Sequence, residues 1–167
     1  MRQAVSLTLF LLWVLVGVSL DVNALVVHRP AALARREIVT RTVSFGPPLW
    51  SGQAYRGELL LVQTEEICPP AGGRVDEKIA EKWHGHVLLV LDTACSRGGM
   101  VARAELHGAV GVLVESSMDS SGISSLVNIP VEILTHGDFE VLKDFIRNGF
   151  VLEVSLGRNL NILRYAT

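Results

Sequence analysis

The sequence contains little cysteine and few aromatic residues. Two cysteines, Cys68 and Cys95, occur among its 167 residues, and aromatic residues make up 6%. The Cys-x-x-Cys spacing of zinc ribbons and thioredoxin-like redox sites is therefore absent. In an oxidising compartment such an isolated pair is most simply one disulfide, and two free buried thiols are the alternative. The bridge would close a loop of about 27 residues and stabilise the fold by roughly 3 kcal/mol.

The chain also lacks a charge excess of either sign. It carries 15 Lys and Arg against 17 Asp and Glu, a formal net charge of −2. Without a basic field, nucleic acid is not an expected partner. The sequence contains no Asn-x-Ser/Thr acceptor for N-glycosylation and no internal repeat.

One long hydrophobic run is present, and it lies at the N-terminus. Val5–Leu20 carries no charge, follows Met1 and Arg2, and precedes Val22 and Ala24 at the −3 and −1 positions of a cleavage site. This pattern predicts a secretory signal peptide, residues 1–24, cleaved between Ala24 and Leu25. A cleaved chain would be secreted or lumenal, with the vacuole and endosome among its destinations. The alternative is an uncleaved segment that anchors the chain in a membrane, which is the one membrane contact we expect.

The remaining pattern predicts a mixed, β-rich α/β fold. Continuous apolar runs such as 87–90 are typical of strands buried on both faces, and 135–149 has a helical apolar stripe between Thr135 and Gly149. We expect a small sheet or barrel of about six to seven strands, flanked by two or three short helices. The expected strands cover 36–49, 55–63, 85–92, 109–115, 128–134 and 150–157, and the expected helices cover 76–84, 99–109 and 135–149.

The segment around Cys95 lacks the spacing of a catalytic loop. A phosphatase cradle needs five residues between its Cys and Arg, but Arg97 follows Cys95 by two positions. Gly98-Gly99 does not provide the Gly-x-Gly-x-x-Gly of a dinucleotide site, and the serine-rich residues 116–125 lack Gly-x-Ser-x-Gly. No nucleophile is therefore indicated.

The histidines and carboxylates likewise form no recognisable catalytic or metal-binding motif in the sequence. His84 and His86 have a spacing that could share a metal, but the sequence places no third ligand beside them. Asp92 and Glu115 follow buried strands, where they could line a crevice at a sheet edge. We expect no enzyme activity, no metal and no cofactor.

Five segments, in order over residues 44–154, resemble the protease-associated (PA) domain family. They are the entry Phe45–Leu49, the strand and loop Gly57–Cys68, the strand and loop Gly85–Cys95, the helix-to-strand segment Ala102–Ser116 with Gly108 and Ala109, and the Ile-Pro strand and final helix Asn128–Gly149 with Pro130. The resemblance maps the paired cysteines of the family onto Cys68 and Cys95. The chain departs from the family pattern at Asp92–Ala94, at Arg97 and at Met100.

The resemblance implies a secreted, stand-alone PA-domain protein. Its organisation would be a signal peptide (1–24), an N-terminal arm or first strand (25–43), a PA domain (44–157) and a C-terminal tail (158–167). PA domains are non-catalytic modules of the secretory pathway that bind proteins or peptides. The alternative is an accessory fragment, substrate-binding or lid-like, of a larger peptidase, sorting receptor or RING ubiquitin ligase ectodomain. The candidate interaction loops carry Ser96, Arg97, Gly98, Gly99, Ser120 and Ser121.

Overall fold

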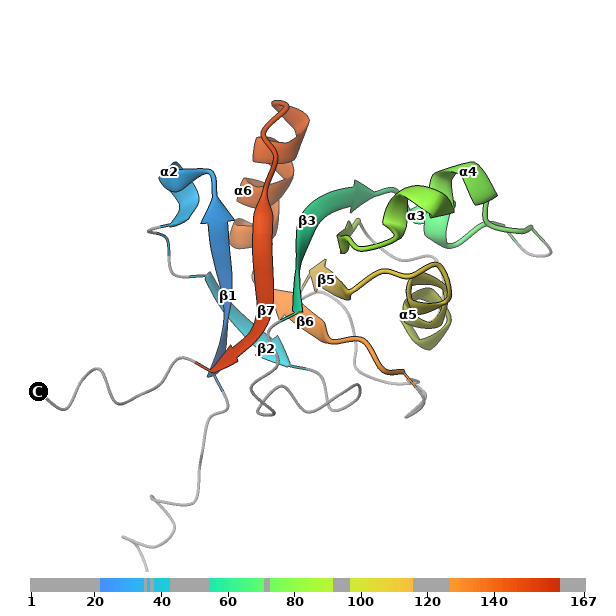
Figure 1. Ribbon diagram of the computed structural model, residues 1–167, viewed down its shortest axis with the longest axis horizontal. Coiled ribbons are helices and arrows are strands. Elements are labelled where there is room, and N and C mark those ends of the chain that lie inside the picture. The colour runs from blue at the N-terminus through green and yellow to red at the C-terminus, as the bar shows by residue number, and fades with distance from the viewer. Residues whose placement is uncertain are drawn as a thin grey trace, which may run out of the picture.

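The computed structural model describes residues 22–34, 36, 38–42, 55–70, 73–91, 97–115 and 127–159 (Figure 1). Their strands form a closed barrel in the order β1-β2-β6-β5-β4-β3-β7. The strands are β1 (Val22–Arg29), β2 (Ile38–Thr42), β3 (Tyr55–Val62), β4 (Val87–Val90), β5 (Gly111–Glu115), β6 (Val131–Leu134) and β7 (Glu153–Asn159). The predicted β-rich mixed fold with a small barrel is confirmed.

The barrel contains a parallel block and an antiparallel block. Strands β3, β4, β5 and β6 are parallel neighbours, whereas β1, β2 and β7 pair antiparallel with their neighbours. All four residues of β4 are buried, because Val87 and Leu89 face the inner core while Leu88 and Val90 face an outer helical layer. This two-sided burial explains why parallel strands here read as continuous apolar runs.

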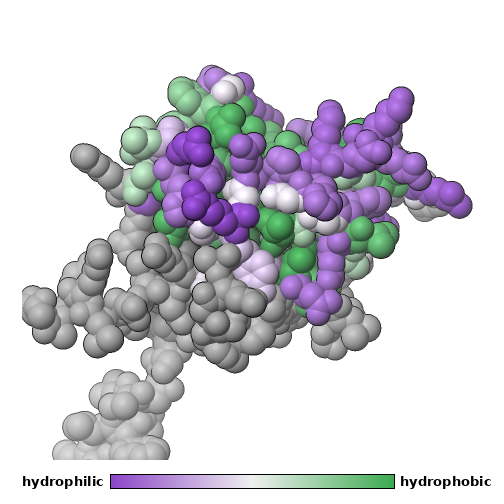
Figure 2. Space-filling model, in the orientation of Figure 1, coloured by the Kyte–Doolittle hydropathy of each residue, from purple (hydrophilic) through white to green (hydrophobic). Residues whose placement is uncertain are grey.

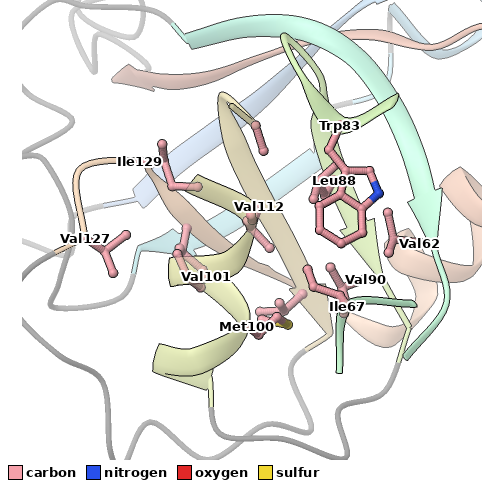
Figure 3. Packing of buried hydrophobic residues seen from close by; sticks show 14 of the residues in the cluster. Val62, Ile67, Trp83, Leu88, Val90, Met100, Val101, Val112, Val127 and Ile129 are labelled. Carbon is pink, nitrogen blue, oxygen red and sulfur yellow. The ribbon is translucent and has the colours of Figure 1, made fainter. Parts of the chain in front are cut away.

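The outer layer consists of α5 (Arg97–Leu106), α3 (Thr64–Ile67), α4 (Glu77–Ala80) and the 3-10 helix η2 (Glu81–Trp83). Met100 and Val101 of α5 lie close to Ile67, Val90 and Val112 in an outer core (Figure 3). The surface over α4 and η2 is hydrophilic (Figure 2), since charged side chains point outward there: Glu77, Lys78, Glu81 and Lys82.

Helix α6 (His136–Arg147) completes the inner core. Thr135 caps it by accepting a hydrogen bond from the Asp138 backbone N–H, and this start confirms the predicted helix boundary. Phe139 and Leu142 are buried in the inner core, and α6 packs against β3 and β5. Because α6 follows β6 directly, it covers the end of the barrel at which the parallel strands finish.

The N-terminal segment forms more of the barrel than the predicted arm or single strand. Residues 25–43 contain most of β1, the one-turn helix α2 (Ala31–Ala34) and β2, and β1 also pairs with β7. Strand β1 begins at Val22, so the expected cleavage after Ala24 would remove residues 22–24, which pair with β2. That cleavage stays a prediction. Within the described residues, no helix has the length and hydrophobicity to span a membrane.

Candidate functional site

The four parallel strands end together at one end of the barrel, which we call the carboxyl edge. It is formed by the residues that finish or follow these strands: Gln63, Thr64, Leu91, Glu115, Thr135 and His136. Helices α3, α5 and α6 begin here, each after a parallel strand. In open parallel sheets this is the end at which ligands bind, because loops and helix N-termini converge there.

A histidine and a glutamate are paired on this edge. His136 Nδ1 lies 2.5 Å from Glu115 Oε1, and the two side chains are 73% and 20% exposed. The pairing of Nδ1 with the carboxylate fixes the orientation of the ring. The exposed ring then offers one polar contact at the carboxyl edge.

Hydrogen bonds hold the backbone of the carboxyl edge in place. The Thr64 hydroxyl donates to the Leu91 carbonyl oxygen at 2.9 Å, which ties the start of α3 to the end of β4. The Arg36 guanidinium lies 2.9 Å from the Asp138 carboxylate in the first turn of α6.

One of the two predicted interaction loops is partly helical. Arg97, Gly98 and Gly99 form the first turn of α5, so helix begins two residues before the predicted start at Gly99. The helix is anchored from its first turn by Met100, whose side chain is fully buried. Met100, where the sequence departs from the PA-domain pattern that it resembles, is therefore a core position.

Several of the remaining predicted positions are not among the described residues. They are Ser96, Ser120, Ser121, Cys95 and Asp92. In the sequence these residues follow β4 and β5, whose last residues lie at the carboxyl edge.

The predicted structural residues lie mainly at the opposite end of the parallel block. Gly108 has a positive φ of 78°, and an added Cβ would come within 2.5 Å of the His84 ring. Ala109 and Pro130 are buried, and Gly149 ends α6 with a φ of 82°. The positive φ values explain why glycine follows both helices.

His84 and His86 also lie at that opposite end, before β4. His86 Nδ1 is 2.9 Å from the His84 carbonyl oxygen, and its Nε2 is 3.9 Å from Glu58 Oε2. Among the described residues, no three His, Cys, Asp or Glu side chains converge as metal ligands.

Sequence reasoning identified Glu115 at a strand end but not its partner. His136 comes 21 positions later in the chain, and the pair forms only because β5 and β6 are parallel neighbours. The sequence signal that could have pointed to His136 is its position just after the strand that follows Ile129-Pro130, at the start of a capped helix.

Cys68 is the one cysteine among the described residues. It is buried at the end of α3 and is not a free thiol. Cys95 lies outside the described residues, so its pairing with Cys68 stays a prediction.

We expect Cys95→Ser to lower the free energy of unfolding by about 3 kcal/mol in urea titrations, because a loop constraint on the unfolded chain is lost. Unreduced, unfolded wild-type protein should bind no thiol reagent; labelling of two thiols would contradict the bridge.

Comparisons with known proteins give a fold but no family. No protein-family model matches the chain, and no curated protein sequence matches it. Solved structures that resemble it include an aminopeptidase from Aneurinibacillus sp. strain AM-1, with a TM-score of 0.57 and 15% identity. They also include BSAP, a zinc aminopeptidase from Bacillus subtilis, at 0.56 and 17%, and a peptidase M28 precursor from Shewanella amazonensis SB2B, at 0.52 and 14%.

The extent of these matches is asymmetric. Each covers 80% of this chain, but only 29% of the two aminopeptidases and 33% of the M28 precursor. The chain thus spans about a third of the length of the peptidases that it resembles. At identities this low, the likeness shows a shared barrel fold.

Proposed function

We propose that this chain is a non-catalytic interaction module of the PA-domain type, which binds a protein or peptide in the secretory pathway. The observation that supports this most is the match of 80% of the chain to under a third of the aminopeptidases. A module that makes up a minor part of a peptidase chain is suited to an accessory role. The ordered PA-like segments of the sequence support the same assignment.

The carboxyl edge is the binding surface in this proposal. Strand addition to a sheet edge is one general way to bind a peptide, but the described strands close into a barrel and leave no edge strand. A partner must then be bound by loops and strand ends. In the sequence the two predicted interaction loops follow strands that end at the carboxyl edge, and the exposed ring of His136 lies beside Glu115 on that edge.

The second candidate function is that of an accessory module that binds a folded peptidase. The identity of the structural neighbours, which are aminopeptidases and an M28 peptidase precursor, favours it. Here the partner of the carboxyl edge would be a folded peptidase and not a short peptide. Peptide binding therefore discriminates between the two candidates.

The test uses protein secreted from cells that express the full reading frame, and a random-peptide phage library as the probe. We expect enriched peptides to bind wild-type protein and to lose at least about tenfold in affinity, or about 1.4 kcal/mol, against the variant Glu115→Ala/His136→Ala. The matched control is Glu58→Ala/His86→Ala, which removes the same residue types from the opposite end and should leave the dissociation constant unchanged. If no peptide is enriched over blank beads, or if both variants bind equally well, the proposal fails.

A further inference from the structure

Within the described part of the chain, the barrel interior contains one carboxylate. Glu132 of β6 is fully buried, and its strand neighbours are Leu113 of β5 and Thr42 of β2. Among the described residues, the other buried polar side chains are Thr40 and Ser155. A buried carboxylate is costly unless its oxygens are hydrogen-bonded or it keeps its proton.

One oxygen of Glu132 is satisfied by an irregularity in β7. The pairing of β1 with β7 shifts between Ala24 and Val26, where β7 contains an extra residue. Gly157 lies in this bulge with a φ of 82°, and its N–H donates to Glu132 Oε1 at 2.9 Å. Glycine suits this position because other residues rarely adopt such a backbone conformation. Glu132 thus links β6 to β7 through the barrel interior.

The second oxygen has no partner of its own. Among the described residues, Glu132 Oε2 and the Thr40 hydroxyl are the two buried side-chain oxygens without a hydrogen bond. Burial raises the pKa of Glu132, and the nearby Thr40 hydroxyl and Gly157 N–H oppose this only in part. The Thr40 hydroxyl can donate to Oε2 in either protonation state, so it is the burial of the carboxylate, and not a missing donor, that favours the proton.

No described charged group compensates a negative charge on Glu132. On β2 the next residue after Thr40 is Arg41, which is exposed on the outside, and on β5 the neighbour is Leu113. On β7, the Ser155 hydroxyl lies 2.6 Å from the ring of His28 of β1, and Glu153 is paired with Arg29 and Arg56. None of these groups is among the causes of the Glu132 pKa shift.

Glu132 lies on the seam between β6 and β2. The described register pairs of this seam are Arg41 with Ile133 and Thr42 with Glu132. A charge on Glu132 would therefore lie directly beside the pairing of these two strands.

We propose that Glu132 is a proton-operated latch on the β2–β6 seam, which keeps the barrel closed while Glu132 holds its proton. In the closed state Oε1 accepts a hydrogen bond from the Gly157 N–H, and the neutral acid lies near the Thr40 hydroxyl. When the proton leaves to solvent, an uncompensated carboxylate remains in the apolar interior, and separation of β2 from β6 hydrates it. Because the pKa is raised in the folded state, the closed barrel is favoured in acid and loosens as the pH rises through that value.

Hydrogen exchange measured by mass spectrometry tests the latch. At about pH 8 compared with about pH 5, and after correction for intrinsic exchange, residues 38–42 and 131–134 should exchange at least about tenfold faster in wild-type protein. Residues 87–90, which lie in β4 and do not pair with β6, should show no difference. Glu132→Gln should remove the pH effect, because the amide keeps an acceptor for Gly157 and never ionises. Glu115→Gln, at the carboxyl edge, should retain it.

Several results would overturn the latch. These are equal protection of the seam at both pH values in wild-type protein, a pH effect that persists in Glu132→Gln, or an equal effect in all strands. If Glu132→Gln does not fold, carbon-13 NMR of the wild-type protein decides instead. The Glu132 carboxyl carbon should then titrate well above the ordinary range, together with amide signals of β2; titration in the ordinary range would refute the proposal.

Discussion

Replacement of Met100 by lysine is expected to lower the free energy of unfolding by about 3–5 kcal/mol, because it leaves an uncompensated charge in the core. Met100 is fully buried in the outer core, close to Ile67 and Val90 (Figure 3). A lysine there must bury its charge among apolar side chains or give up its proton, and both are costly. Urea titration of the purified protein measures the change.

Two controls separate the buried charge from other effects of the substitution. Met100→Leu keeps the volume and apolar character, so it should cost less than about 1.5 kcal/mol. Leu106→Lys introduces the same charge on the same helix, but Leu106 is 80% exposed and the change should stay within about 0.5 kcal/mol. Equal stability of Met100→Lys and Leu106→Lys would show that α5 does not pack as described.

Phe139→Ala is expected to cost about 3–5 kcal/mol, because it leaves a cavity in the inner core. Phe139 is 1% exposed and projects from α6 into the barrel. The loss should appear as a lower urea midpoint in circular dichroism, together with faster hydrogen exchange of α6.

Phe150→Ala is the matched control for the loss of an aromatic ring. Phe150 is 52% exposed, and its ring lies 5.3 Å from that of Phe145 after the end of α6. Its removal should cost less than about 1.5 kcal/mol, since the site is open to water and loses little more than one aromatic contact. Similar losses for both phenylalanines would mean that α6 is not part of the barrel core.

The parallel half of the fold was predictable because it depends on local patterns. Runs such as 87–90, and the capped helix after Thr135, require no knowledge of their neighbours. The N-terminal strands were harder to predict. His28 and Arg29 interrupt the apolar pattern of β1 where its pairing with β7 is irregular, and α2 separates β1 from β2. The barrel closure depends on long-range pairing, which periodicity does not record.

The residues of the candidate site and of the buried acid were predictable only in part, because their contacts also depend on long-range strand pairing. Glu115 was identifiable as the end of a buried strand, but its contact with His136 follows from the β5–β6 pairing. The alternation Val131-Glu132-Ile133 is typical of a strand with one face in water. Closure of the barrel instead directs Glu132 into the interior, where the sequence gives no sign of Thr40 or Gly157.

The proposed binding surface is tested most directly by a hydrogen-exchange footprint of the protein with and without a peptide selected from the phage library. Binding at the carboxyl edge predicts slower exchange at residues 63–66, 97–99 and 135–138 in the complex, with no change at residues 84–86 and 107–109 at the opposite end of the parallel strands. Protection confined to residues 84–86 and 107–109, with residues 63–66 and 135–138 unchanged, would contradict the account.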